Sequence, residues 1–582
     1  MKYGTLGVNA FHGDSSSCLV SGGRVLAAVE EERFVRQKHW AGFPTRSIGY
    51  CLSTAQELGL EISQVAINRL PGAHLGRKIA FSLSHPSAFA GSARKALRGM
   101  RRSRSSESGI TTISGLESAK VVDVEHHAAH LAHAYFLSGL PEALCLSLDG
   151  MGDFASAAWG LGKDGKIEIG GRVFFPNSLG TLYEAFTQIL GFPNYGDEYK
   201  VMGLAAYGNP VYLSRIRDLV KVEDGRYDLN LSYFRHHKTL TQFSWDGEVP
   251  KNDRLYSSRL TALLSDVLGR DGHVEERHKA DVAASVQKLY EECASALLEN
   301  LIREYGSLPV VMAGGCAMNS VANGFLRDRF GLKTFYVPAG AGDAGGALGA
   351  ALYADFKTNL TALQKRELGC FWGPEFSAEE CRSAVAARAE EISSRDIQVT
   401  HCDSAQLVRE VSRRLEQSQV IGWFQGRMEF GARALGNRSI LADPRRADVR
   451  DLINSKIKFR EMFRPFAPSV LAERADEWFE TDDEVPFMEK VYPVIEAQRA
   501  QIPGVVHVDG SARLQTVTVA ANPLYHSLIE AFAERTGVPI LLNTSFNENE
   551  PIVLSPSQAL DCFLRTEMDA VALGSTIVAR SN

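Results

Sequence analysis

Two histidines four residues apart, followed about twenty residues later by an aspartate, form the strongest chemical pattern in the sequence. His126 and His130 lie in HHAAHLAHAYFLSG, an alanine- and leucine-rich run that favours a helix. A spacing of four places both imidazoles on one helix face. An apolar run then predicts a buried strand that ends at Asp149. Two imidazoles and a carboxylate suit a transition metal or acid–base chemistry. The alternative is a helix whose histidines only bond to neighbours, and this is our prediction for His127 and His133, which fall off the shared face.

Glycine-rich loops follow two later strands. Residues 308–313 predict a buried strand, and a double glycine and the start of a helix come directly after it. This order is typical of a nucleotide site, because the helix N-terminus attracts phosphate. In PAGAGDAGGALG, Asp343 lies among glycines, so it is either a turn former or a ligand.

Two single residues give weaker signals. His12 lies in the small-residue loop AFHGDSS, where it is either a general base or a polar surface residue. Lys200 lies in DEYKVMGLAAYG, which predicts a glycine-punctuated loop that either meets a phosphate or is a structural turn.

Basic side chains concentrate in the last third of the chain, in QGRMEFGARALGNRSILADPRR and INSKIKFREMFRPFAP. Glycines and short strands interrupt them, which favours a phosphate-holding pocket over a helix face. Nucleic-acid binding is the competitor, but no stacking aromatics accompany the basic residues. Arg513 adds a further cation, and ILLNTSFN predicts a strand that ends in short polar groups.

The elements that must position these residues repeat. Strand–turn–strand units are predicted near Thr5 and again near Leu146, which indicates a duplicated lobe. Residues 280–305 predict a long amphipathic helix, and a polar connector between residues 355 and 376 predicts a domain boundary. The Lys- and Arg-rich segment 73–108 predicts either a solvated insertion or a basic amphipathic helix for an acidic or membrane-associated partner.

Bulk properties exclude several classes. The 582 residues are too many for one core, and a net charge of -6 gives no case for nucleic acid. The nine cysteines form no C-x-x-C pair, so neither a zinc ribbon nor a disulfide framework is expected. The N-terminus carries no signal-peptide pattern and no apolar run is long enough for a membrane span, so we expect a cytoplasmic protein.

Taken together and in this order, the motifs are specific. They include FHGDSS, EEERFVRQKH, HHAAHLAHAYFLSG, LDGMGD, EYKVMGLAAYG, GGCAMNS, GDAGGALGA, GRMEFGARALGNRSILADPR, IKFREMFRPFAP, HVDGSARLQTV and NTSFNENEPIV. Over nearly its whole length the chain resembles the O-carbamoyltransferase family of antibiotic and nodulation-factor biosynthesis.

The resemblance implies an α/β protein of two domains. Residues 1–360 are expected to form a duplicated actin-like carbamoyl-transfer domain, interrupted by the basic segment 73–108. Residues 370–582 are expected to form a YrdC-like domain that makes carbamoyl adenylate from ATP and carbamoyl phosphate. The intermediate then passes inside the protein to the first domain, where a hydroxyl of a small-molecule acceptor attacks it.

The resemblance also assigns roles to single residues. It implies iron(II), or another divalent transition metal, on His126, His130, Asp149 and Asp343, with His12 as the base. It implies contacts of Lys38 and Ser178 to the intermediate or the acceptor, and of Gly315 and Asn319 to the nucleotide. The pocket for carbamoyl phosphate and ATP, the latter with Mg²⁺, is implied on Arg433, Arg438, Lys458, Arg464, Arg513, Asn543 and Ser545.

Other functions stay open at this point. A hydrogenase-type carbamoyltransferase adds an acylphosphatase-like domain and C-x-x-C zinc fingers, and this sequence has neither. A tRNA-modifying transferase lacks support from the overall charge, and a regulatory module of the same fold without catalysis is the rival from another class. The sequence specifies neither the acceptor nor the oligomeric state, although a homodimer is common for enzymes of this size.

Overall fold

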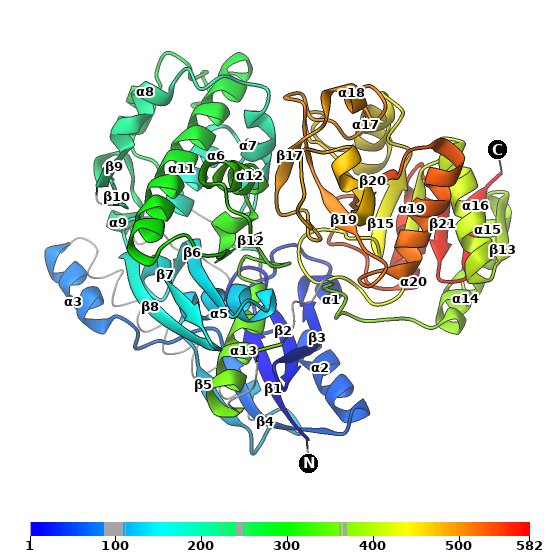
Figure 1. The fold of residues 1–582 in the computed structure, drawn as a ribbon, viewed down its shortest axis with the longest axis horizontal. Coiled ribbons are helices and arrows are strands. Elements are labelled where there is room, and N and C mark those ends of the chain that lie inside the picture. The colour runs from blue at the N-terminus through cyan, green and yellow to red at the C-terminus, as the bar shows by residue number, and fades with distance from the viewer. Residues whose placement is uncertain are drawn as a thin grey trace. The chain divides into compact units, whose positions relative to one another are not determined.

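The computed structural model describes residues 2–85, 109–110, 112–223, 225–239, 248–251, 253–359, 363–364 and 369–581. The chain divides into two compact units, Met1–Glu367 and Leu368–Asn582 (Figure 1). Most of the basic segment, residues 86–108, lies outside the described part, including Arg94, Lys95, Arg98, Arg101, Arg102 and Arg104. Its first part forms a helix, α3 (Leu75–Ser84).

The first sheet of the Met1–Glu367 unit has the strand order β3-β2-β1-β4-β5. Its first three strands pair antiparallel, β4 runs parallel to β1, and β5 runs parallel to β4. The alternation of apolar residues buries Leu6, Val8 and Val65 against helix α2 (Thr45–Glu57). The strands are β1 (Lys2–Asn9), β2 (Ser16–Ser21), β3 (Arg24–Glu30), β4 (Leu60–Ile67) and β5 (Lys120–Asp123).

The second sheet repeats this topology, with the order β8-β7-β6-β11-β12. Again three antiparallel strands are followed by two parallel ones. The predicted duplication is therefore confirmed, and the unit has the actin-like fold. The strands are β6 (Glu142–Gly152), β7 (Ala155–Lys163), β8 (Lys166–Phe174), β11 (Val310–Ala313) and β12 (Phe335–Tyr336).

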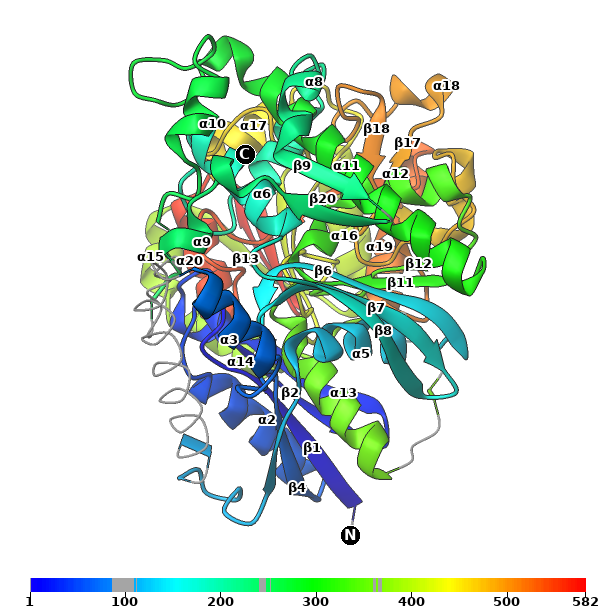
Figure 2. The same ribbon diagram turned by 90° about the vertical axis from the view of Figure 1, so that its left-hand side faces the viewer.

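Helices α5 (His126–Ser138) and α13 (Gly345–Asn359) lie between the two sheets (Figure 2). Helix α13 packs on β1, β2 and β4, whereas α5 packs on β6, β7 and β11, and the two helices pack on each other. Gly349 allows this contact, because a Cβ there would lie 1.8 Å from the carbonyl oxygen of Ala129. The two helices therefore join the two lobes.

Other helices of this unit cover the second sheet or cross its loops. The long helix predicted at residues 280–305 is confirmed as α11 (Glu276–Tyr305). The loop predicted around Lys200 is wrong, because α7 (Glu198–Ala205) spans it and packs on α11, so helix packing overrides the single glycine inside it. The others near the site are α1 (Glu32–Val35), α6 (Leu179–Ile189), η3 (Gly315–Met318) and α12 (Ser320–Phe330).

The Leu368–Asn582 unit is built on one mixed eight-stranded sheet of order β13-β22-β21-β14-β15-β20-β16-β19. Helix α16 (Ser404–Glu416) packs against α19 (Pro523–Thr536), and its buried Leu407, Val411 and Leu415 lie four residues apart. The strands are β13 (Ile397–His401), β14 (Ile421–Phe424), β15 (Arg438–Ala442), β16 (Ala467–Leu471), β19 (Gln515–Val517), β20 (Ile540–Ser545), β21 (Ala570–Leu573) and β22 (Thr576–Arg580).

We predict that Gly349→Ala destabilises the protein by about 1–3 kcal/mol, because the added methyl group forces α13 away from the α5 backbone. Urea unfolding followed by circular dichroism measures the change. Gly49→Ala is the matched control, because nothing lies within 4 Å of a Cβ at that exposed position of α2. Equal stability of the Gly349→Ala variant and the wild type would contradict this account of the helix contact.

Candidate active site

Four side chains from both lobes converge in the Met1–Glu367 unit. Nε2 of His126 lies 3.0 Å from Nε2 of His130 and 3.0 Å from Oδ2 of Asp149. Oδ1 of Asp343 lies 3.6 Å from Nε2 of His126 and 3.7 Å from Nε2 of His130. The histidines are fully buried and Asp149 is buried, whereas the Asp343 side chain retains 17% exposure. The structure thus brings together the four residues expected to bind a metal.

The donor set and its spacing fit a transition-metal ion. Ligand atoms at about 2.0–2.2 Å from one ion lie about 3.0–3.6 Å from one another, close to the separations of 3.0 to 3.8 Å found here. Oδ1 of Asp343 is also buried without a hydrogen-bond partner among the described residues. A buried carboxylate oxygen in that state requires a cation or a proton. Two imidazoles with two carboxylates suit iron, manganese or zinc.

Local structure holds each ligand in place. Glu125 caps α5 by accepting the backbone N–H of Ala128 at 2.8 Å, and Asp153 Oδ2 accepts the backbone N–H of His126 at 3.0 Å. The register of β6 against β7 shifts between Leu148 and Gly152, directly at Asp149. Such irregularities redirect side chains next to active sites. Gly152 is required there, because a Cβ would lie 2.0 Å from the His126 ring.

The second oxygen of Asp149 is bound by the protein itself. Oδ1 accepts the backbone N–H of Gly315 at 2.8 Å, which leaves Oδ2 facing the histidines. Ser178, a predicted contact of the intermediate, caps α6 and donates its hydroxyl to the carbonyl of Gly150 at 2.6 Å. Both contacts fix the direction of the Asp149 carboxylate, as outer-shell partners do in metal sites.

The charges at this centre support one another. Burial lowers the pKa of His126, but the hydrogen bond that His126 donates to Asp149 and the charge of Asp343 outweigh it and raise that pKa to about 9. Burial raises the pKa of Asp149, but the hydrogen bond with His126 and the charges of His126 and His130 lower that pKa well below its usual range. The pKa of Asp343 is raised by burial and by the charge of Asp149. The metal-free cluster therefore holds protons that a cation has to displace.

The other two histidines of α5 are neutral. Burial is the largest cause that lowers the pKa of His127 to about 4 and that of His133 to about 3. Nδ1 of His127 lies 2.8 Å from the hydroxyl of Ser147. Their positions away from the cluster agree with a structural role.

His12 lies against the histidine–aspartate cluster. Its ring stacks on that of His126 with 5.3 Å between centroids and 27° between planes. The loop that carries it is tied to the segment after α1. The backbone N–H of Ser15 donates to the carbonyl of Trp40, and the Ser15 hydroxyl and the backbone N–H of Phe11 both donate to the carbonyl of Gly42. Phe11 and Asp14 adopt left-handed backbone with φ of 59° and 56°. A strained and strongly bonded loop is typical of a functional site.

Asp14, Glu32 and His39 form a second group whose polar atoms lie within 4.8 Å of one another. Their atoms are already engaged, because His39 Nδ1 lies 2.8 Å from Asp14, its backbone N–H bonds to Glu32, and Glu32 also pairs with Arg33. Burial lowers the pKa of His39, but the charge of Asp14 outweighs it and raises that pKa to about 9. This group is an ion-pair network. The neighbouring Lys38 has an exposed side chain.

The predicted nucleotide loop lies directly beside Asp149. Asn319 caps α12 through Ala322 N–H and exchanges two hydrogen bonds with the amide of Gln287, at 2.9 and 3.2 Å. Gln287 in turn accepts the hydroxyl of Tyr183 at 2.9 Å. Gln287 was not predicted from the sequence, although a glutamine inside the buried stripe of a long helix is a signal for a polar partner.

Arginines gather in the Leu368–Asn582 unit. The pKa of Arg513 is lowered well below its usual range by burial and by the charges of Arg433, Arg460 and Arg464. Burial is likewise the main cause that lowers the pKa of His507 to about 4, with Arg513 and Arg450 contributing. Nε of Arg513, Nε of Arg450 and Nε2 of His507 are buried without a hydrogen-bond partner in the described chain. Crowded cations with unpaired N–H groups are the surroundings that a phosphate requires. We call these six residues the arginine cluster.

The remaining predicted pocket residues occupy internal networks. Arg438 is fully buried, donates to the carbonyls of Gln425, Asn437, Pro374 and Gly426, and stacks on Phe424 at 3.7 Å. Lys458 is also buried, and its ammonium bonds to Ser545 and Asn547. The amide of Asn543 donates to Ala434, Ser469 and Gln515. In the structure these groups therefore form hydrogen bonds inside the protein, near the ends of the strands. Of the predicted pocket residues, Arg433, Arg464 and Arg513 belong to the arginine cluster.

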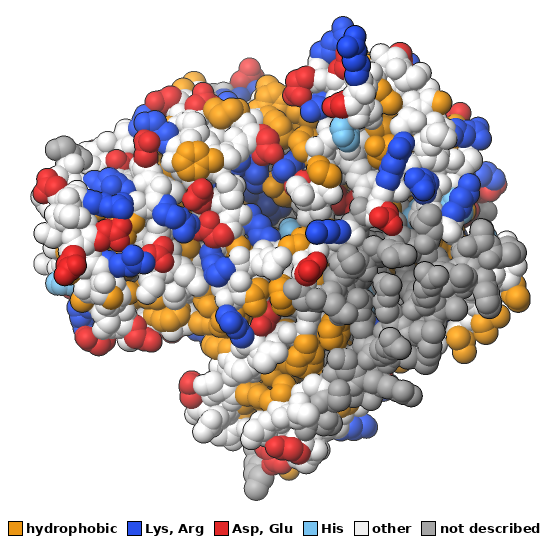
Figure 3. Space-filling model, turned by 180° about the vertical axis from the view of Figure 1, so that it is seen from behind, with side chains coloured by type: hydrophobic (Ala, Val, Ile, Leu, Met, Phe, Trp, Pro, Cys, Tyr) orange, Lys and Arg blue, Asp and Glu red, His pale blue; other side chains and the backbone are white. Residues whose placement is uncertain are grey.

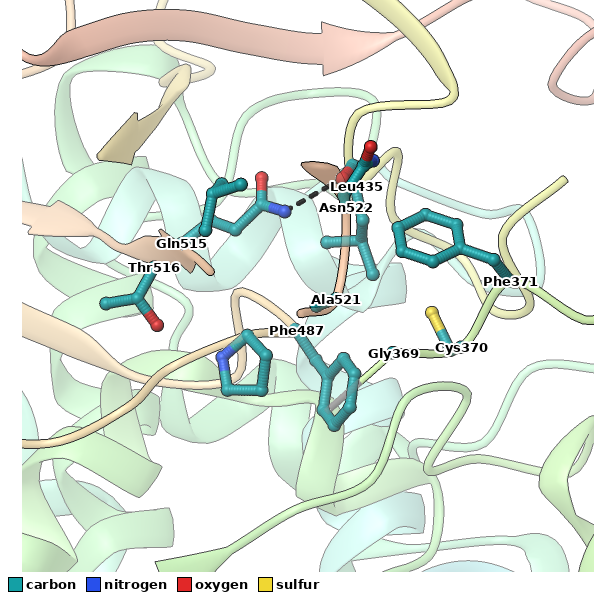
Figure 4. A pocket seen from close by; sticks show the side chains of 11 residues that line it. Gly369, Cys370, Phe371, Leu435, Phe487, Gln515, Thr516, Ala521 and Asn522 are labelled. Carbon is teal, nitrogen blue, oxygen red and sulfur yellow. Dashed lines mark hydrogen bonds between the residues drawn. The ribbon is translucent and has the colours of Figure 1, made fainter. Parts of the chain in front are cut away.

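A separate small cavity lies in the same unit (Figure 4). Gly369, Phe371, Leu435 and Phe487 help to line it, and Gln515 donates to the carbonyl of Leu435 at its edge. Its volume of about 10 Å³ holds roughly one water molecule. It is therefore too small for a substrate.

The surface gives no sign of a dedicated polyanion face on the side drawn in Figure 3, where Lys and Arg side chains are interspersed with Asp and Glu. Among the described helices, none combines the length and the apolar composition that a bilayer crossing demands.

Comparison with known families covers most of the chain. A model described as carbamoyltransferase N-terminus matches residues 4–80 and 92–352, and one described as carbamoyltransferase C-terminus matches residues 412–580.

Similar proteins extend over the full length. An uncharacterised Synechocystis protein is 36% identical over 99% of this chain and 96% of its own. The nodulation protein NolNO of Sinorhizobium fredii is 38% identical over 98% of this chain and 80% of its own. The 3'-hydroxymethylcephem-O-carbamoyltransferase of Streptomyces clavuligerus is 30% identical over 62% of this chain and 60% of its own.

We predict that the protein binds one cobalt(II) ion per chain, and that affinity rises about tenfold per pH unit between pH 6.5 and 8.5. The sign follows from His126, whose raised pKa means that a proton has to leave before the imidazole binds metal. Isothermal titration calorimetry at three pH values measures the affinity.

Asp343→Asn should weaken this binding at least tenfold, because it removes a charged ligand. Asp164→Asn is the matched control, since Asp164 lies exposed in the β7–β8 turn. A pH-independent affinity, or equal affinity of the Asp343→Asn variant, would show that the cluster is not the metal site.

Proposed function

The chain belongs to the carbamoyltransferase family, and from this we propose that it is an ATP-dependent O-carbamoyltransferase that forms carbamoyl adenylate and transfers the carbamoyl group to a hydroxyl of a small molecule. The observation that carries the proposal is the presence of two centres of opposite character. One unit holds the histidine–aspartate cluster beside His12, and the other holds the arginine cluster.

The arginine cluster suits the activation step. Carbamoyl phosphate and ATP are both polyanions, and Arg433, Arg464 and Arg513 offset their mutual repulsion. Water cleaves carbamoyl phosphate to carbamate and phosphate. An oxygen of the carbamate then attacks the α-phosphorus of ATP, pyrophosphate leaves, and carbamoyl adenylate remains. Activation is needed because carbamate itself is a poor electrophile.

The histidine–aspartate cluster suits the transfer step. His12 accepts the proton of the acceptor hydroxyl, the hydroxyl oxygen attacks the carbamoyl carbon, and the bond to the phosphate oxygen breaks to release AMP. A divalent ion held by His126, His130, Asp149 and Asp343 supplies Lewis acidity toward the carbamoyl oxygen when bound. The stacking of His12 on His126 supports this role for His12.

The acceptor is a hydroxylated small molecule in this proposal. Support comes from the cephem O-carbamoyltransferase named above and from the net charge of -6, which gives no case for nucleic acid.

The first experiment is to measure pyrophosphate release from ATP with iron-loaded protein, with and without carbamoyl phosphate and without acceptor. The proposal predicts release that depends on carbamoyl phosphate. Aminoglycosides, nucleosides and oligosaccharides are then screened by mass spectrometry for the gain of one carbamoyl group. Absence of carbamoyl phosphate-dependent release would refute the activation chemistry.

We predict that His130→Ala lowers carbamoyl transfer at least 100-fold while adenylate formation stays within about twofold, because the cluster and the arginines lie in different units. His401→Ala, an exposed position, is the control. Equal loss of both steps in the His130→Ala variant would contradict the assignment of one reaction to each centre.

Arg464→Ala should lower carbamoyl phosphate-dependent ATP consumption by about 100-fold, as expected for the loss of a charge-assisted contact to phosphate. Arg382→Ala in α14 (Ala378–Ala386) removes an exposed arginine of the same unit and should retain the rate. Normal consumption by the Arg464→Ala variant would mean that the arginine cluster has another role.

A further inference from the structure

Tyr195 lies on the loop between α6 and α7, beside the residues that position His12. Its ring meets the edge of His39 with 5.4 Å between centroids and 78° between planes, and His39 is ion-paired with Asp14. A Cβ at Gly13 would lie 2.4 Å from the Tyr195 hydroxyl, and one at Gly196 would lie 2.4 Å from Nε2 of His39. The hydroxyl therefore touches the backbone of the residue that follows His12.

The Tyr195 hydroxyl combines the lack of a protein partner with exposure. Within the described residues it makes no hydrogen bond, and the side chain is only half-buried. Buried phenols normally find a protein partner, and four of them do so here: Tyr135 donates to Pro141, Tyr183 to Gln287, Tyr290 to Cys316 and Tyr492 to Asp483. The hydroxyls of Tyr227 and Tyr525 also lack a partner among the described residues, but their side chains are buried, whereas that of Tyr195 can be reached. The uncommitted O–H is thus available to a ligand.

The charges around Tyr195 keep it a donor. Burial raises the pKa of its phenol well above the usual value, and the carboxylates of Asp343, Asp14 and Asp149 add to the effect. The hydroxyl lies against the backbone of Gly13, and the ring of the preceding residue, His12, stacks on His126, so the hydroxyl lies beside the proposed transfer centre. The ring contact with His39 fixes its direction at low entropic cost, since a tyrosine has few rotatable bonds.

Carbamoyl transfer needs a donor at this place. When the acceptor oxygen attacks, the carbonyl carbon becomes tetrahedral and negative charge develops on the carbamoyl oxygen. Preorganised hydrogen-bond donors lower the barrier of such steps. His12 accepts a proton in the proposed reaction, and carboxylates only accept hydrogen bonds. Tyr195 is the neutral donor that the geometry supplies.

Resting on the proposed function, we infer that Tyr195 is a catalytic residue of the transfer step, whose hydroxyl donates a hydrogen bond to the carbamoyl oxygen as the acceptor attacks. No proton is transferred from the phenol in this role. The hydrogen bond strengthens as charge develops, so the residue contributes to turnover more than to binding of the adenylate.

The test is Tyr195→Phe, which removes the hydroxyl and keeps the ring against His39. Iron-loaded enzyme is mixed with ATP and radiolabelled carbamoyl phosphate in a single turnover, and the carbamoyl adenylate is followed through formation and decay, with water as the acceptor. We expect formation within about twofold of wild type and decay slowed about 10- to 100-fold, so that labelled adenylate accumulates.

Tyr207→Phe is the matched control, because Tyr207 is 43% exposed just beyond α7 and carries the same change. Cobalt(II) affinity of the Tyr195→Phe variant should equal that of wild type, which separates a catalytic role from a distorted metal cluster. Unchanged decay, or weakened cobalt binding together with slow decay, overturns the inference. Failure of the wild type to form adenylate overturns the proposed function instead, and the inference falls with it.

Discussion

The contact between α5 and α13 is the constraint on which the histidine–aspartate cluster depends. His126 and His130 lie on α5, and Asp343 lies just before α13, so the distance between the two helices sets the separation of the clustered polar atoms. Each helix packs on the sheet of the other lobe. Helix α13 follows the second sheet in the chain but packs on β1 and β2, and α5 follows the first sheet but packs on β6 and β11. The close approach at Gly349 makes that distance insensitive to side-chain rearrangement, since backbone meets backbone.

Both centres bring like charges close together. Asp149 and Asp343 share a buried space, and Arg433, Arg460 and Arg464 crowd Arg513. Such arrangements cost stability in the absence of ligands and become favourable when counter-charges bind. At such places the residue types suit a function better than they suit the stability of the fold. Separation into two units also allows one centre to favour cations and the other to favour anions.

The sequence predicted the positions of side chains wherever the periodicity of a helix or a strand determines them. The spacing of His126 and His130 sets one helix face, and the strand before Asp149 delivers that carboxylate to the same place, so these three could be grouped without a structure. The repeated strand–turn–strand pattern likewise indicated two equivalent lobes, which the sheet orders confirm. Asp343 was ambiguous, because an aspartate between glycines looks the same in a turn and in a ligand site.

Other residues could not be sorted from sequence, because their environment is tertiary. Arg438 and Arg464 look alike in a basic segment, yet the pairing of β14 with β15 encloses Arg438 among carbonyls. Lys200 was placed in a loop, although packing on α11 makes the segment helical. Tyr195 had no signal at all, since its significance comes from two glycines, Gly13 and Gly196, that are distant in the chain.

The repeated sheet order has a consequence for the origin of the transfer centre. His12 follows β1 and Asp149 lies in the last part of β6, the corresponding first strands of the two lobes. His126 begins the helix after β5, and Asp343 precedes the helix after β12, the corresponding fifth strands. The four positions are thus two pairs related by pseudo-twofold symmetry. A symmetric dimer of one ancestral repeat would present two identical pairs at its axis. Fusion of the two copies would free each position to change independently, so that the proposed base and three of the four proposed ligands could diverge from only two ancestral sites.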